Sequence, residues 1–168
     1  ARQPIRYATK DEANIAVMTE STQRAFAIRV SRDDYAAARC TTLRFTSLRP
    51  VTHGVRNPIA EWLDGLGLFD RRSHDKFVPP QVFSLPKRQI ALFLRHLWAT
   101  GGSIQITPGG RGGRIYYATT SRRLADDVAR RLLRFGLTAR IRVARKAGYR
   151  DGYHVDVSGS ADQKVFLR

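Results

Sequence analysis

The sequence has little cysteine and no long apolar run. Cys40 is the only cysteine in 168 residues, so the chain can form neither an internal disulfide nor a cysteine-rich zinc site. No apolar stretch reaches the roughly 20 residues that span a bilayer, so we expect no membrane partner. The four histidines lie far apart, without the spacing of metal ligands. These absences are typical of a protein that works in a reducing cytoplasm.

Negative charge is also scarce. Lys and Arg total 30 residues against 14 for Asp and Glu, which gives a net charge of +16 at pH 7. Five of the basic residues are lysines and 25 are arginines, and arginine suits planar, bidentate contact with phosphate or guanine. Codon usage in a GC-rich genome would explain the excess of arginine over lysine, but not the net charge. Because 42% of the residues are hydrophobic, we expect a folded protein of one or two small domains that binds nucleic acid.

An internal repeat organises the chain. The sequence IRYAT at 5–9 matches IYYAT at 115–119 with an offset of 110 residues, and IRV occurs at both 28–30 and 141–143. A helical stretch separates the two segments in each copy, so the order strand, helix, strand is kept. We therefore predict a duplicated α+β fold with antiparallel sheets.

The second copy shows a complete α-β-β-α-β-β pattern. Its elements are predicted, in chain order, as a helix at 86–100, strands at 103–107 and 114–119, a helix at 121–135, and strands at 140–145 and 153–157.

The first copy shows only the later part of the pattern. Its elements are predicted as a strand at 5–9, a helix at 11–26, and strands near 27–31 and 40–45. Thr9 and Glu12 have the spacing of a capping box for this helix.

The repeat also suggests a division of the chain. We assign 1–56 to an N-terminal half, 57–84 to a connecting helix and linker, and 85–168 to a C-terminal half. The counterpart of the helix and strand at 86–107 would lie before residue 1. We expect the preceding 30 or so residues to contain an apolar helix that ends in Asp-Gly or Glu-Gly.

Alternation along the strands separates an apolar face from a polar one. In the strand at 140–145, Ile141 and Val143 would meet the helices, while Arg140 and Arg142 would stand on the other side. Ile104 and Ile106 are expected to face the helices in the same way. The polar face is either a DNA-binding surface, since the major groove admits a two-stranded ribbon, or the solvated face of an antiparallel sheet.

The repeated arginines favour contact with DNA. The candidate DNA-binding residues are Arg29, Arg44, Gln105, Arg111, Arg114, Tyr116, Arg140, Arg142, Arg145, Lys146, Tyr149 and His154.

Three short motifs point to a known family. LWATGGSI at 97–104 ends a predicted helix, KFVP at 76–79 precedes that helix, and YATTS at 117–121 joins a strand to the next helix. Together with the duplicated pattern, they resemble the LAGLIDADG homing endonucleases. The likeness is to the endonuclease domain of an intein, of the kind found in mycobacterial replicative DNA helicases of the DnaB type.

The resemblance implies a fold and a set of partners. The fold would be a duplicated α-β-β-α-β-β chain whose antiparallel sheets form a DNA-binding saddle, in a monomer with pseudo-two-fold symmetry. The DNA would be a long duplex, the intein insertion site in the host gene, read in the major groove. The splicing domain of the intein would be the second partner, and the bacterial cytoplasm the compartment.

The resemblance also implies a chemistry that this sequence departs from. In the family, an acidic residue at the base of each motif helix binds Mg²⁺, which activates water and supports cleavage of both strands. Gly101 stands where the second Asp is expected, and Gly102 matches the usual glycine that follows. The first motif does not occur in these 168 residues. We therefore expect no intact metal site, and impaired or lost cleavage.

Lys146 is the candidate for a basic residue that assists the family's chemistry. A loop lysine that touches phosphate is the alternative interpretation.

Three functions remain open from the sequence. They are a homing endonuclease domain with a degenerate second metal site, a non-catalytic DNA-binding module on the same fold, and an RNA-binding, maturase-like protein. Nothing in the sequence separates A-form from B-form helices. An N-terminal cysteine and a terminal His-Asn pair, which a complete intein carries, are absent, so splicing would need the rest of the intein.

Overall fold

The chain divides into two compact units. The computed structural model describes residues 5–50, 55–107 and 113–167, and its units are Ala1–Phe69 and Asp70–Arg168. The division falls inside the connecting segment expected at 57–84. Ile59 packs into the core of the first unit, whereas Val78 packs into the core of the second. The segment is therefore shared between the two units, because each end of it supplies an apolar side chain to a different core.

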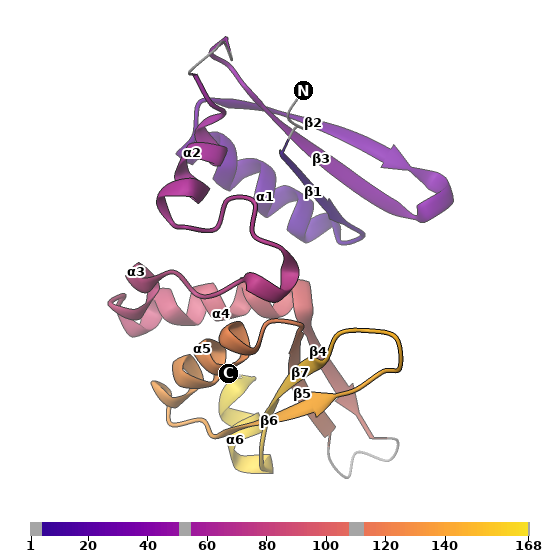
Figure 1. Cartoon of the computed structure of the whole chain (residues 1–168), viewed down its shortest axis with the longest axis vertical. Coiled ribbons are helices and arrows are strands. Elements are labelled where there is room, and N and C mark those ends of the chain that lie inside the picture. The colour runs from indigo at the N-terminus through magenta and orange to yellow at the C-terminus, as the bar shows by residue number, and fades with distance from the viewer. Residues whose placement is uncertain (1–4, 51–54, 108–112, 168) are drawn as a thin grey trace. The chain divides into compact units, whose positions relative to one another are not determined.

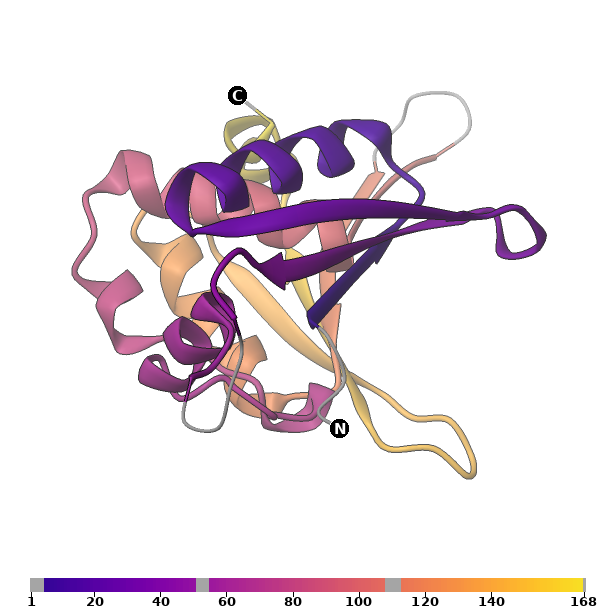
Figure 2. The ribbon, with the colours of Figure 1, turned by 90° about the horizontal axis from the view of Figure 1, so that it is seen from above.

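The first unit is a three-stranded antiparallel sheet with two helices (Figure 1). Its strand order is β1-β3-β2, and Leu43 and Phe45 of β3 are buried with Ile15 of α1. Its elements are β1 (Ile5–Thr9), α1 (Glu12–Ala25), β2 (Ile28–Tyr35), a 3-10 turn (Ala36–Ala38), β3 (Cys40–Ser47) and α2 (Pro58–Gly65). β2 and β3 form a hairpin (Figure 2), and β1 pairs with β3 from Phe45 to Thr41, one residue short of the start of β3 at Cys40.

The hairpin is longer than predicted, since its far end is polar. The expected strands ended at residues 31 and 45, where the apolar alternation stops, but backbone pairing continues from Ser31 to Tyr35 on β2. Polar strand residues such as Asp33 and Asp34 carry no periodic signal.

The capping box predicted for α1 is wrong. Asp11 caps the helix, and its carboxylate accepts hydrogen bonds from the backbone N–H of Ala13 at 2.8 Å and of Asn14 at 3.4 Å. Glu12 instead accepts hydrogen bonds from Arg32, at 2.7 and 2.8 Å, and these bonds lower the pKa of the Glu12 carboxyl. Asp11 caps the helix in place of Thr9 because its short side chain reaches the first free N–H groups of the helix.

The second unit confirms the predicted α-β-β-α-β-β order. Its strands form one antiparallel sheet in the order β4-β5-β7-β6. Its elements are a 3-10 turn (Ser73–Asp75), α3 (Pro80–Phe83), α4 (Lys87–Gly101), β4 (Gly102–Ile106), β5 (Gly113–Thr119), α5 (Arg122–Leu133), β6 (Ala139–Ala144), β7 (Gly152–Val157) and α6 (Ser160–Phe166). The sequence did not predict α3 and α6.

The two units repeat one another in topology. The order β5-β7-β6 with α5 matches the order β1-β3-β2 with α1. β5 pairs with β4 as well, whereas β1 pairs with β3 alone among the described strands. None of the helices in the described parts of the chain is both long and apolar enough to cross a membrane.

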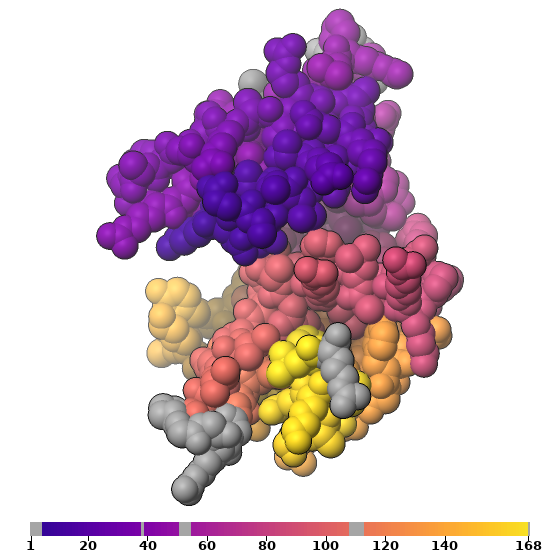
Figure 3. All heavy atoms as spheres, turned by 180° about the vertical axis from the view of Figure 1, so that it is seen from behind, coloured from indigo at the N-terminus to yellow at the C-terminus, as the bar shows by residue number. Residues whose placement is uncertain are grey.

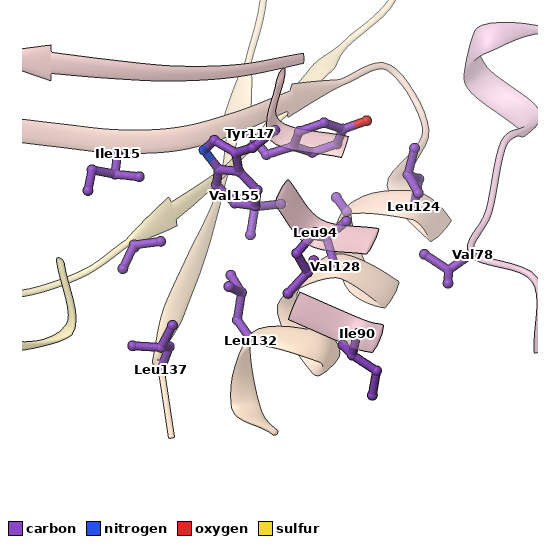
Figure 4. Packing of buried hydrophobic residues seen from close by; sticks show 13 residues of the cluster. Val78, Ile90, Leu94, Ile115, Tyr117, Leu124, Val128, Leu132, Leu137 and Val155 are labelled. Atoms are coloured by element: carbon purple, nitrogen blue, oxygen red, sulfur yellow. The ribbon is translucent and has the colours of Figure 1, made fainter. Parts of the chain in front are cut away.

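One face of the second sheet packs against α4 and α5. Ile90 and Leu94 of α4 and Val128 of α5 belong to one buried cluster with Tyr117 and Val155 of the sheet (Figure 4). These side chains are less than 7% exposed. Burial of Tyr117 and Val155 therefore fixes which residues of their strands face the helices and which face the opposite side. Figure 3 shows α6 (yellow) beside this layer, with Phe166 at a ring-centroid distance of 4.8 Å from Trp98.

Two apolar residues of β4 are not covered as expected. Ile104 and Ile106 lie on the helix side of the sheet by register, opposite Ile115 and Gly113, but they are 53% and 78% exposed. β4 is an edge strand among those described, and α4 contacts only its beginning because the strand leads directly away from the helix.

Candidate nucleic-acid interface and helix-base site

The sheet of the second unit carries a polar surface on the side opposite α4 and α5. Strand pairing places Ser103, Tyr116, Asp156 and Arg140 in one row across the four strands. We call this surface the open face and define it by Ser103, Gln105, Arg114, Tyr116, Arg140, Arg142, His154 and Asp156. The predicted alternation is confirmed in β5 and β7, where the residues between these are buried, but Val143 of β6, which was expected to meet the helices, is 47% exposed.

An acidic residue lies at the centre of the open face. Asp156 is 4% exposed, and its carboxylate accepts two hydrogen bonds from Arg114, from Nε at 2.5 Å and from Nη2 at 3.1 Å. Arg142 forms an ion pair with the same carboxylate, with 3.5 Å between Nε and Oδ2. One buried carboxylate therefore pairs with two arginines of the surface and holds one of them, Arg114, by two hydrogen bonds.

Aromatic rings complete this network. The guanidinium of Arg114 lies 4.2 Å above the ring of Tyr116, and Tyr116 stacks on His154 with 4.8 Å between ring centroids. Nδ1 of His154 is 3.0 Å from Nη2 of Arg114. The hydrogen bonds from Arg114 to Asp156 raise the pKa of this guanidinium, so it stays charged at every accessible pH. The structure thus joins three predicted site residues in one cluster.

The first sheet has a similar polar face. Arg44 and Arg29 lie on the side opposite the buried Leu43 and Phe45, as the alternation predicted. Arg44 forms an ion pair with Asp33 of the neighbouring strand, and both side chains are about half exposed. The first unit therefore presents a braced arginine as well, although its carboxylate partner is open to solvent.

The β6–β7 turn holds the remaining described candidates. Arg145, Lys146 and Tyr149 are exposed, and Nζ of Lys146 lies 4.4 Å from the centroid of the Tyr149 ring. Gln105, on β4, is exposed and pairs in register with Arg114. Arg111 lies outside the described residues.

Sequence reasoning missed the acidic members of this surface. Asp156 and Asp33 were not candidates, since a carboxylate repels phosphate. The signal was nevertheless in the sequence, because Asp156 alternates with Val155 and Val157 and so must share a face with the arginines of the adjoining strands.

A second site of interest is the base of α4, where the sequence has Gly101 and Gly102. A Cβ atom on Gly101 would lie 2.8 Å from Cε2 of Tyr117, closer than real contacts allow. A Cβ atom on Gly102 would lie 2.1 Å from Cδ1 of Trp98. The rings of Tyr117 and Trp98 pack together at 5.5 Å, and burial raises the pKa of the Tyr117 hydroxyl, which keeps it neutral. Two buried aromatic rings therefore fill the space beside both glycines.

The residues at this position do not fit a metal ion. Gly101 has no side chain to ligate a metal, and the Tyr117 ring occupies the space in which a carboxylate side chain at residue 101 would begin. Among residues 5–50, 55–107 and 113–167, no three His, Cys, Asp or Glu side chains are grouped so that they could hold a metal. The Tyr117 ring thus supplies a steric reason, besides the missing carboxylate, for the prediction that Gly101 offers no metal ligand.

Comparison with known proteins identifies the second unit. Residues 88–168 match the profile of a family described as LAGLIDADG-like domain. This part of the chain is a LAGLIDADG-like domain. The match begins in α4, one residue after the helix starts, and it runs through α6.

The relatives are replication proteins. The replicative DNA helicase DnaB of Synechocystis sp. is 44% identical over 119 residues, which is 70% of this chain and 14% of the helicase. DnaB of Rhodothermus marinus is 39% identical over 165 residues, covering 97% of this chain and 18% of the helicase. The replication factor C small subunit of Methanocaldococcus jannaschii is 28% identical over 108 residues, 64% of this chain and 5% of that protein. The chain therefore corresponds to a small segment of each relative.

Solved structures confirm the fold over nearly the whole chain. A mesophilic variant of the homing endonuclease I-DmoI gives a TM-score of 0.64 at 12% identity, covering 97% of this chain and 77% of that one. I-DmoI solved in complex with DNA and Mn gives 0.63 at 13% identity, covering 95% and 76%. The predicted duplicated α+β fold of the LAGLIDADG homing endonucleases is confirmed.

The packing at the base of α4 makes a prediction about stability. Gly101→Ala should destabilise the second unit by about 1–3 kcal/mol, because the new methyl group overpacks against the Tyr117 ring. The chain has two tryptophans, so urea unfolding followed by Trp98 fluorescence in a Trp62→Phe background reports on this unit. Adding Tyr117→Leu should remove most of the penalty that Gly101→Ala imposes.

Gly65→Ala is the matched control. Gly65 is also the last residue of its helix, but no atom lies within 4 Å of a Cβ placed there. Because Gly65 lies in the first unit, the control is followed by Trp62 fluorescence in a Trp98→Phe background, and it should be neutral or stabilising by up to about 1 kcal/mol. If Gly101→Ala proved as harmless as Gly65→Ala, Tyr117 would not be what excludes a side chain at residue 101.

Proposed function

We propose that the chain is part of an intein-encoded homing endonuclease domain that binds a long duplex DNA site and has impaired or lost cleavage. The open face of the second unit supports the proposed DNA binding. The absence of a carboxylate at Gly101, at the base of α4, supports the proposed loss of cleavage.

The chemistry of the open face supports duplex DNA as the partner. Arg140 and Arg142 are exposed on adjoining positions of one face of β6, and neither faces a covering helix. A two-stranded ribbon of this kind fits a major groove, in which arginine is the commonest reader of guanine. The net charge of +16 supplies attraction to phosphate, which raises affinity without reading sequence. I-DmoI, which has the same fold, binds DNA in its solved complex.

The pattern of relatives supports an intein. The same short segment occurs in a helicase and in a replication factor C subunit, two different proteins of which it forms only 14% and 5%. A segment that recurs in unrelated hosts behaves as an insertion rather than as part of either host's fold. The proposed partners are thus the insertion site in a host gene and the rest of the intein, in a bacterial cytoplasm, with the chain acting as a monomer.

The helix base supports impaired cleavage. The family's metal chemistry needs a carboxylate at the position of Gly101, and this chain has neither the ligand nor the space for one. Lys146, the candidate basic residue, lies in an exposed turn beside Tyr149 and suits contact with phosphate. The proposed DNA-binding surface therefore keeps its basic residues, whereas the proposed position of the metal ligand has no carboxylate.

Binding is tested with two pairs of arginines. The double variant Arg140→Ala/Arg142→Ala should bind duplex DNA carrying the uninterrupted host-gene sequence at least about tenfold more weakly than the parent chain, since each arginine that reads a base contributes about 1–3 kcal/mol. Arg130→Ala/Arg134→Ala removes the same charge from an exposed position of α5 and from the exposed residue that follows this helix, and it is the control. Equal losses in the two double variants, by fluorescence anisotropy at fixed salt, would contradict binding through the open face.

Cleavage is tested on the same duplex. The chain should bind it with steep salt dependence but make no double-strand break in Mg²⁺ or Mn²⁺. I-DmoI on its own site serves as the positive control for the assay. Cleavage of both strands by this chain would show that other groups replace the ligand missing at Gly101.

A further inference from the structure

The buried carboxylate on a strongly basic surface calls for a physical reason. The side chain of Asp156 is 5% exposed, and it stands among arginines on the face that would approach phosphates. A negative charge there weakens general attraction to DNA. Burial of a carboxylate also costs free energy, unless its partners are well placed. An acidic residue in this position must therefore contribute something other than charge.

The geometry around Arg114 shows what that contribution is. Asp156 holds the Nε and Nη2 edge of the guanidinium with two hydrogen bonds, and the Tyr116 ring supports its plane from one side at 4.2 Å. Nη1 of Arg114 donates to no group among the described residues, and the side chain is 38% exposed. Nη2 also lies 3.0 Å from Nδ1 of His154, so the arginine is fixed and the two N–H groups of Nη1 remain for a base edge.

A fixed fork suits a base edge more than a phosphate. Contact with phosphate depends chiefly on positive charge, which a mobile arginine or lysine also supplies. Recognition of O6 and N7 of guanine needs the guanidinium to lie in the plane of the base. Ordering the side chain in advance also removes part of the entropy cost of binding.

The first unit offers a comparison. There Asp33 pairs with Arg44, but both side chains are 46–47% exposed, so solvent screens the pair. Only the pair on the second sheet combines two hydrogen bonds, a buried carboxylate and an aromatic support.

We propose that Asp156 is a positioning residue that fixes Arg114 on the open face so that Arg114 reads a guanine in the major groove. This inference rests on the proposed function, since it needs a specific duplex site. It assigns the reading of one guanine to this braced side chain, in addition to the base contacts proposed for Arg140 and Arg142.

The test separates specific from general binding. Asp156→Asn should lower affinity for the host-gene duplex by about tenfold or more, but leave unchanged or raise affinity for an unrelated duplex of equal length. Asp151→Asn removes the same charge from an exposed position of the β6–β7 turn and is the matched control. This control should leave the ratio of the two affinities unchanged.

Two further measurements keep the proposal falsifiable. Arg114→Lys retains the charge but not the fork, and it should lose the same discrimination as Asp156→Asn even if the latter folds poorly. Replacing each guanine singly with 7-deazaguanine, which lacks the N7 acceptor, should weaken the parent chain at one position at which Arg114→Lys shows no further loss.

The outcomes separate the proposed function from the role of Asp156. A parent chain that does not distinguish the two duplexes would overturn the proposed function, and this inference with it. A parent chain that does distinguish them, with Asp156→Asn and Asp151→Asn behaving alike, would overturn the role of Asp156 alone.

Discussion

Burial of Tyr117 and Val155 beneath α4 and α5 is the interaction on which the other features of the second unit depend. Side chains alternate along a strand, so burying these residues turns Tyr116 and Asp156 to the opposite face. A slip of one residue would exchange the two faces and place the arginines in the core. The same Tyr117 ring fills the space beside Gly101. One packing arrangement thus exposes the basic surface and closes the position of the metal ligand.

The strands of the second unit and its helices α4 and α5 were predictable because their apolar residues recur with clear periods. Leu124, Val128 and Leu132 recur at helical spacing and are all buried, and the two-residue period placed Arg140 and Arg142 correctly. What sequence could not supply were features without a period. The polar end of the β2–β3 hairpin has no apolar pattern, and the caps of α1 depend on which side chain reaches a free N–H.

The candidate site was likewise predictable only in part. Alternation predicted which residues share the open face, but not that Asp156 would bind two of its arginines, because pairing between side chains on different strands depends on register. The missing carboxylate at Gly101 was visible in the sequence. The Tyr117 ring that excludes a side chain there was not, since residues 101 and 117 meet only in the folded unit.

The central claim is that the open face reads duplex DNA in the major groove. Methylation interference on the bound host-gene duplex tests it most directly, because methylation at guanine N7 blocks the major groove and methylation at adenine N3 blocks the minor groove. We expect methylation at guanine N7 to interfere with binding, and we expect this interference to be weaker in Arg140→Ala/Arg142→Ala. Interference confined to adenine N3, or none at any base, would contradict it.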